Sequence, residues 1–164
     1  MPVEWVLPIV AGIAALIALF LWRPLRSAWR EAVEQRAREQ FITWREQLEA
    51  KFFDLASSTG KPRGLRWTDC EFEREVAFAR NRRTGSLCGM IGVTISFEAI
   101  EGGGMEEVEA VSNLRAATAV FQHDGRRWHT NGQTLFNLSP SEAIDFYRDD
   151  LERVQPVAAT QRQQ

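Results

Sequence analysis

The sequence predicts an α+β protein: a single N-terminal transmembrane helix, a long amphipathic helix packed on an antiparallel sheet of about four strands, and a short C-terminal helix. Three observations predict this fold class. Eighteen residues without a charge run from Trp5 to Trp22. An apolar stripe with steps of three and four residues follows, as in an amphipathic helix. Farther on, apolar and polar residues alternate with period two, as in half-buried strands.

The uncharged stretch from Trp5 to Trp22 has the length of a membrane span. At 1.5 Å per residue it reaches about 27 Å, close to the hydrocarbon thickness of a bilayer, and tryptophan at each end suits the headgroup layers. A cleaved signal peptide fits less well, because Glu4 precedes the apolar core and bulky residues follow it. A buried helix of a globular core fits poorly, since the stretch has no polar face.

Arginines crowd the C-terminal flank of this stretch, beginning with Arg23, Arg26 and Arg30. The positive-inside rule therefore predicts that the N-terminus is outside and that the C-terminal domain is cytoplasmic. The lipid bilayer is the first expected partner. Small residues recur along one side of the span, which would let two copies approach closely and form a homodimer. They are Ala11, Ala15 and Ala18.

Composition limits the class of protein. Of 164 residues, 20 are basic and 22 acidic, a formal net charge of -2 that argues against a nucleic-acid-binding protein. The chain left after the span is long enough for one domain. Cys70 and Cys88 lie far apart and form no CxxC motif, so we interpret them first as two buried thiols and second as a disulfide or metal pair.

These patterns divide the chain into five segments. They are an anchor with its basic flank (1–26), an amphipathic helix (27–56), a loop (57–64), an α+β domain completed by that helix (65–155) and a disordered tail (156–164).

The amphipathic helix is predicted to begin after a break or kink, because Pro24 disfavours helical geometry before it and Ser27 offers a cap. The mean step of its stripe is about 3.7 residues, which favours packing on the protein's own sheet over a coiled coil. The stripe comprises Trp29, Val33, Ala37, Phe41, Trp44, Leu48, Phe52 and Leu55.

Strand signals begin at Leu65 and are clearest from Leu87 to Ala99, where the odd positions are apolar and predict one face in the core. A turn at 81–85 predicts a hairpin before this strand. Residues 105–117 fit either a strand or a helix, and we favour a strand.

A second hairpin is predicted at Asp124-Gly125, where a two-residue turn would place Phe121 opposite Trp128. The run Ser139-Pro140-Ser141-Glu142 then predicts a helix start with a capping box. The apolar residues after it predict that this helix continues to Val154.

This order of elements, from Trp29 to Val154, resembles the NTF2-like and cystatin-like cone folds, including a strand that ends in an Asp-Gly turn followed by Trp128. The resemblance implies a cone that could enclose a pocket. Because the same cone is used by enzymes, ligand-binding proteins and interaction modules, it implies no particular chemistry.

No HExxH, GxSxG, paired CxxC or P-loop motif organises the polar residues. The candidate ligand-binding residues are His129, Trp67 and Asp69, and we expect no cofactor and no metal. The sequence therefore favours a membrane-anchored domain for protein interaction or scaffolding. The alternative is an NTF2-like small-molecule-binding or enzymatic domain tethered to the membrane.

Overall fold

The computed structural model describes residues 6–59, 64–102 and 115–154. Within its first helix, the side chains of 6–10, 13–19, 21 and 23–28 lie outside the description. The predicted tail at 156–164 and most of the ambiguous segment 105–117 also lie outside it. The chain forms two compact units, residues 1–39 and 40–164.

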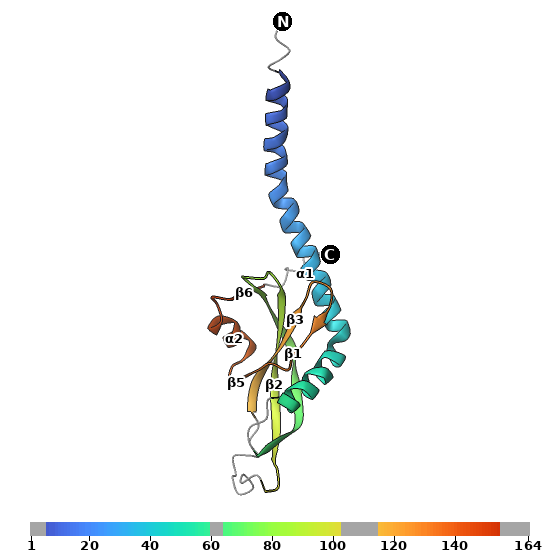
Figure 1. The fold of residues 1–164 in the computed structure, drawn as a ribbon, viewed down its shortest axis with the longest axis vertical. Coiled ribbons are helices and arrows are strands. Elements are labelled where there is room, and N and C mark those ends of the chain that lie inside the picture. Colours follow the sequence, from blue (N-terminus) through green and yellow to red (C-terminus); the bar gives the residue numbers. More distant parts are fainter. Residues whose placement is uncertain (1–5, 60–63, 103–114, 155–164) are drawn as a thin grey trace, which may run out of the picture. The chain divides into compact units, whose positions relative to one another are not determined.

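The described elements are two helices and six strands (Figure 1). In chain order they are α1 (Val6–Thr59), β1 (Leu65–Asn81), β2 (Leu87–Ala99), β3 (Arg115–His123), β4 (Trp128–His129), β5 (Thr134–Phe136), α2 (Pro140–Phe146) and β6 (Leu151–Arg153).

Helix α1 is unbroken from Val6 to Thr59, so of the predicted break or kink at Pro24 the break is wrong. A proline removes only one N–H from the helical ladder, and the turns on either side keep their own bonds. The helix also continues past residue 56. The hydroxyls of Ser58 and Thr59 donate to the carbonyl of Leu55 at 2.8 and 2.7 Å, and they satisfy an acceptor that the helix end leaves open.

Across the described residues, no helix is long and apolar enough to cross a membrane.

In the first unit, residues 1–39, the predicted stripe is only partly buried. Trp29 and Val33 are exposed. Phe20 and Trp22 are also exposed. Trp5 lies outside the described residues, as do the side chains of Ala15 and Ala18.

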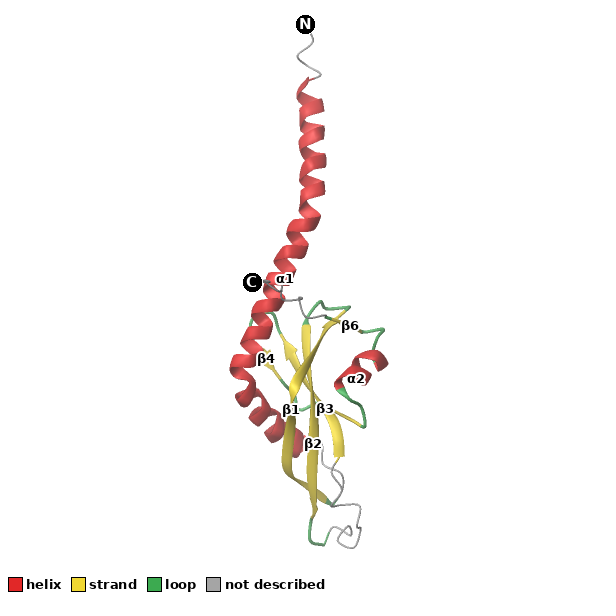
Figure 2. Cartoon of the chain, turned by 180° about the vertical axis from the view of Figure 1, so that it is seen from behind, coloured by secondary structure: helices red, strands yellow, loops and turns green. Residues whose placement is uncertain are grey.

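The second unit contains one antiparallel sheet, in the order β4-β3-β2-β1-β6, with β5 also paired to β3 (Figure 2). The predicted antiparallel sheet is confirmed, but it has six strands instead of about four. The additional strands are short. They could not be predicted from the sequence, because two or three residues are too few to show an alternation of apolar and polar side chains.

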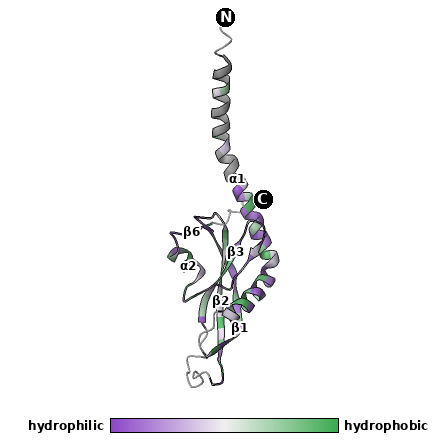
Figure 3. Cartoon of the chain, viewed as in Figure 1, coloured by the Kyte–Doolittle hydropathy of each residue, from purple (hydrophilic) through white to green (hydrophobic). Residues whose placement is uncertain are grey.

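The C-terminal part of α1 covers one face of this sheet, and hydrophobic and hydrophilic residues alternate around that part of the helix (Figures 1 and 3). Phe41 is fully buried there. Its ring meets those of Phe78, Phe121 and Trp128 edge to face, at centroid distances of 5.8, 5.4 and 4.8 Å. Phe52 extends the same core toward Trp67. Of the apolar stripe predicted from helical spacing, Phe41, Leu48 and Phe52 are buried in this core, whereas Trp44 is exposed.

Helix α2 covers the opposite face of the sheet (Figure 2). A second apolar cluster lies beneath it, which corrects the prediction that β2 buries only one face. The even positions Cys88 and Met90 are apolar enough to pack there. The buried members of this cluster are Ala79, Cys88, Met90, Ala143, Ile144 and Leu151.

The capping box at the start of α2 is confirmed. The Ser139 hydroxyl accepts from the Glu142 amide, and the Glu142 carboxylate accepts from the Ser139 amide at 2.8 Å. The predicted continuation to Val154 is wrong, because α2 ends at Phe146. Leu151 belongs to β6, where it pairs with Asn81. Periodicity over the apolar residues could not distinguish a longer helix from a turn followed by a short strand.

The hairpin at Asp124 has a longer loop than predicted. His123 pairs with Trp128, so Phe121 does not lie directly opposite Trp128. The cause is the Asp124 carboxylate, which accepts from the amides of Arg126 and Arg127 at 2.8 and 2.9 Å. This side-chain turn lengthens the loop to four residues. The pairing of β3 with β4 is therefore shifted by two residues from the predicted one. Because side chains alternate between faces with a period of two, Trp128 keeps the predicted face of the sheet and still reaches the core.

Strand β1 is interrupted by a bulge, since its register against β2 shifts between Phe72 and Val76. Arg45 of α1 binds this bulge. It donates to the backbone carbonyls of Glu73 and Arg74, the latter at 2.6 Å, and forms an ion pair with Glu49 at 2.6 Å. The ion pair with Glu49 also orients the guanidinium onto the strand.

Candidate functional site

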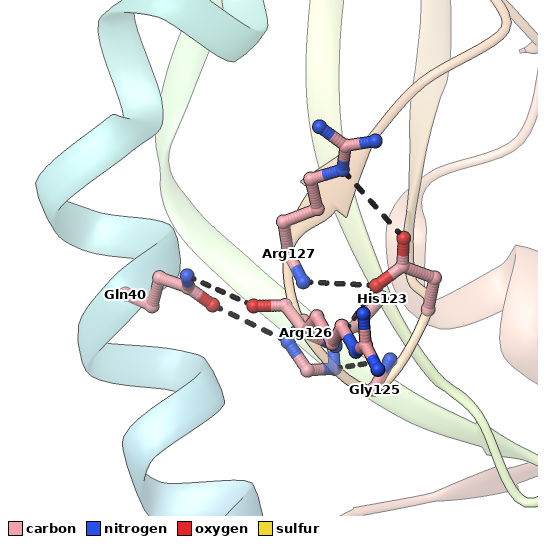
Figure 4. Close-up of polar contacts among 6 residues, drawn as sticks. Gln40, His123, Gly125, Arg126 and Arg127 are labelled. Carbon is pink, nitrogen blue, oxygen red and sulfur yellow. Dashed lines mark hydrogen bonds and ion pairs between the residues drawn. The ribbon is translucent and has the colours of Figure 1, made fainter.

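The most densely connected polar cluster described joins α1 to the β3–β4 turn (Figure 4). Gln40 accepts from Nε2 of His123 through its Oε1, at 3.3 Å, and its amide nitrogen donates to the Arg126 carbonyl at 3.2 Å. The Gly125 amide donates to Nδ1 of His123 at 3.2 Å. One glutamine and one histidine therefore fasten the helix to the turn.

These contacts define the protonation state of His123. Nδ1 accepts from an amide, so it carries no proton, and Nε2 must then be the protonated nitrogen that donates to the Gln40 oxygen. The ring lies 5.2 Å from that of Trp128, and the residue is only 7% exposed. His123 is thus a neutral, buried histidine with both ring nitrogens in use.

The electrostatic surroundings favour this neutral form. Burial lowers the pKa of His123, and the nearby His129 lowers it further, while Asp124 opposes both effects. The turn also holds Asp124 in its ionised form, because the amides of Arg127 and Arg126 lower the pKa of that carboxyl. Arg127 adds an ion pair to it at 3.8 Å.

This arrangement is better suited to holding α1 against the β3–β4 turn than to catalysis. A general base needs a nitrogen free to take a proton, and His123 has none. Sequence reasoning missed this cluster because Gln40 lies outside the apolar stripe. The signal that could have found it is His123 directly before the Asp-Gly turn, where a ring nitrogen can accept from a turn amide.

The structure does not bring the predicted site residues together. His129 pairs with Gln122, which pairs with Cys88 at the start of β2. Trp67 pairs with Phe97 near the other end of β2. Cys88 and Phe97 are nine residues apart, or about 30 Å along a strand. No single pocket can therefore contain both His129 and Trp67.

The individual surroundings of these residues differ as well. His129 is half-buried and Trp67 is buried, and His129 Nδ1 and Trp67 Nε1 are buried without hydrogen-bond partners in the described part of the chain. Asp69 is exposed, and its carboxylate accepts from the amide of Cys70 at 2.8 Å. The Asp69 carboxylate thus binds the backbone of the next residue, at the point where the register of β1 against β2 shifts between Trp67 and Asp69.

Both cysteines are free thiols, so the disulfide interpretation is wrong. Cys88 is buried and Cys70 half-buried. Burial raises the pKa of Cys70 to about 12, with further contributions from Asp69 and Glu49, and burial also raises the pKa of Cys88. Because the thiolate is the reactive form, neither thiol is suited to nucleophilic chemistry.

The chain matches no protein-family model, no curated protein and no solved structure. The resemblance to NTF2-like and cystatin-like cones therefore stays a prediction. Among the described residues, no three His, Cys, Asp or Glu side chains are grouped as a metal site would require.

The junction predicts a pH dependence of stability. Because the folded state lowers the pKa of His123, the unfolded chain takes up the proton first as the pH falls below about 6.5. The stabilisation is fully present above that pH and is lost toward the lower, folded-state pKa. We expect the free energy of unfolding to fall between pH 7 and pH 5, by at most about 1.4 kcal/mol per pH unit for this one proton.

Urea unfolding of the full chain in detergent micelles at a series of pH values would measure this slope. The matched variant is His123→Asn, whose amide oxygen can still accept from Gly125 but does not titrate. It should show a shallower slope in the same window. An identical slope in the variant and the wild type would assign the pH dependence to other groups. Asp124 contributes mainly below this window, because its pKa is lowered further from an ordinary value of about 3.9.

Proposed function

We propose that this chain is a single-pass membrane-anchored protein that presents a small cytoplasmic α+β domain for protein interaction or scaffolding. The observation that carries the proposal is the uncharged stretch from Trp5 to Trp22, followed at once by arginines. The length of this stretch supports anchoring, and its basic C-terminal flank supports a cytoplasmic C-terminal domain. The domain that begins at Gln40 is then held next to the membrane surface.

The chemistry of the domain supports an interaction role over an enzymatic one. Its buried histidine is committed to the helix–turn junction, and its thiols have raised pKa values. Its candidate ligand-binding residues lie at opposite ends of β2. The NTF2-like small-molecule or enzymatic alternative requires polar groups that converge on one cavity, and no described observation favours it.

Membrane extraction tests the anchor. The full chain should stay in the membrane pellet after alkaline carbonate treatment. Leu16→Arg with Leu19→Arg places two charges inside the span, each costing about 2.5–3.5 kcal/mol at a helix centre, and should release the protein. The matched control, Leu16→Met with Leu19→Met, should remain in the pellet. Release of the wild-type chain by carbonate would overturn the proposal.

Orientation requires a separate measurement. A reporter fused after Gln164 should be active only when the assay reads the cytoplasm. Asn137 begins an Asn-Leu-Ser sequon, so expression in a host that glycosylates secreted proteins provides the opposite test. Glycan at Asn137 would show that the domain lies outside.

A further inference from the structure

The C-terminal end of α2 exposes two adjacent aromatic rings. Phe146 is 70% exposed and Tyr147 is 38% exposed, although the same short helix buries Ala143 and Ile144 against the sheet. The two rings meet edge to face with centroids 5.0 Å apart. Each ring therefore restricts the other, and the aromatic surface they offer is ordered.

The backbone beneath these rings is held by several hydrogen bonds. The amides of Asp150 and Leu151 both donate to the Tyr147 carbonyl, at 2.9 and 2.8 Å. Arg82, from the β1–β2 turn, donates through its amide to the Asp150 carbonyl and through Nε to the Arg148 carbonyl. The segment is thus fixed to the sheet before any partner binds, which lowers the entropy cost of association.

Strand β6 also holds this segment in place. Arg153 pairs with the Asp145 carboxylate at 3.1 Å and donates to the Ser141 carbonyl at 3.2 Å. By contrast, the exposed carboxylates of Asp149 and Asp150 make no ion pair within the described chain. The segment therefore combines an ordered pair of rings with two aspartates and one exposed arginine, Arg148, which leaves one net negative charge over residues 146–150.

We propose that Phe146, Tyr147, Asp149 and Asp150 form a docking surface for an arginine-bearing segment of a partner protein. This inference rests on the proposed interaction function and names the surface that would perform it. We call these four residues the α2 surface.

Charge and ring chemistry select this partner. The faces of aromatic rings attract cations, and the planar guanidinium stacks on them while its N–H groups donate to carboxylates. A fixed aromatic anchor beside complementary charge is typical of residues that dominate an interface. Acidic side chains two to four positions along the chain from the rings oppose insertion into an anionic membrane, so a protein segment is favoured over lipid as the occupant.

The only tyrosine of the chain is Tyr147, which permits a site-specific measurement. Full-length protein labelled with 3-fluorotyrosine and placed in phosphatidylcholine nanodiscs should give one ¹⁹F resonance. A synthetic peptide of alternating arginine and leucine should shift this resonance in a saturable manner. A peptide of alternating glutamate and leucine should leave it unchanged.

Two double variants separate the α2 surface from general charge. Asp149→Asn with Asp150→Asn should weaken binding of the arginine peptide at least tenfold. Glu71→Gln with Glu75→Gln changes the net charge equally on exposed residues of β1 and should leave the affinity within twofold of wild type. Phe146→Ala should also weaken binding, by about threefold or more, since its exposed ring contributes little to folding.

Several results would overturn the inference. These are an absent or non-saturable shift, an equal shift with the glutamate peptide, and equal affinities for the two double variants. A shift caused by adding phosphatidylserine to the nanodiscs, with no response to peptide, would instead assign the rings to the lipid surface. Carbonate extraction does not involve these residues, so failure here leaves the anchor test independent.

Discussion

Phe41→Ala is expected to reduce the free energy of unfolding by about 3–5 kcal/mol, the range for truncating a large buried aromatic residue. Phe41 is fully buried between α1 and the sheet, and three other rings pack on it. The substitution removes apolar contact and leaves a cavity that neighbouring rings can only partly fill. Urea unfolding of the full chain in micelles, followed by tryptophan fluorescence, would measure the loss.

Phe146→Ala is the matched control, because it removes the same ring from an exposed position. It should change the free energy of unfolding by less than about 0.5 kcal/mol. A loss below about 1 kcal/mol for Phe41→Ala, or equal losses for both variants, would contradict the packing described for α1. The comparison also shows whether fluorescence changes come from unfolding or from the substitution itself.

Gly132→Ala should have an effect of comparable size for a different reason. Gly132 has a φ of 77°, a region that side chains disfavour, and an added Cβ would lie 2.7 Å from the Ala56 nitrogen and 2.9 Å from the Leu55 carbonyl carbon. Those atoms belong to the backbone of α1, so the helix itself would have to move. Strain and overpacking together should cost about 2–5 kcal/mol.

Gly85→Ala isolates the backbone contribution. Gly85 has nearly the same φ, 73°, but open space where its Cβ would lie. That variant should lose only about 1–2 kcal/mol. If Gly132→Ala costs no more than Gly85→Ala, the close approach of the β4–β5 connection to α1 is not maintained in solution.

Those elements whose signals are local were predictable from the sequence. The capping box at Ser139 places each donor and acceptor within four residues, and the alternation from Leu87 to Ala99 spans an entire strand. Both are confirmed. The helical stripe likewise identified Phe41 and Phe52 as core residues, because packing on a sheet selects the same face that the 3.6-residue period defines.

Features that depend on tertiary contacts were missed. Leu151 continues a helical spacing, yet its segment pairs with β1, where Arg82 donates to the preceding carbonyl. The burial of Cys88 and Met90 required a helix on the second face, which no pattern inside β2 can reveal. The hairpin register depended on whether the Asp124 carboxylate would bind two amides.

In the candidate site, too, residue types could be predicted from the sequence, but contacts between distant segments could not. His129, Trp67 and Asp69 are residue types that can serve chemistry, but strand register separates the first two by most of the length of β2. Gln40 and His123 form the observed cluster across 83 positions of sequence, so their contact has no local signature.

The bulge bound by Arg45 affects how copies of this protein behave when they are crowded. Strands at the border of a sheet readily recruit strands from other molecules, a first step in aggregation. Beyond the short pairing with β6, β1 borders the sheet, and two of its carbonyls there are already engaged by the Arg45 guanidinium. A neighbouring chain that approached this stretch would meet an irregular backbone with occupied acceptors. We therefore expect Arg45 to disfavour intermolecular strand pairing along this stretch of β1.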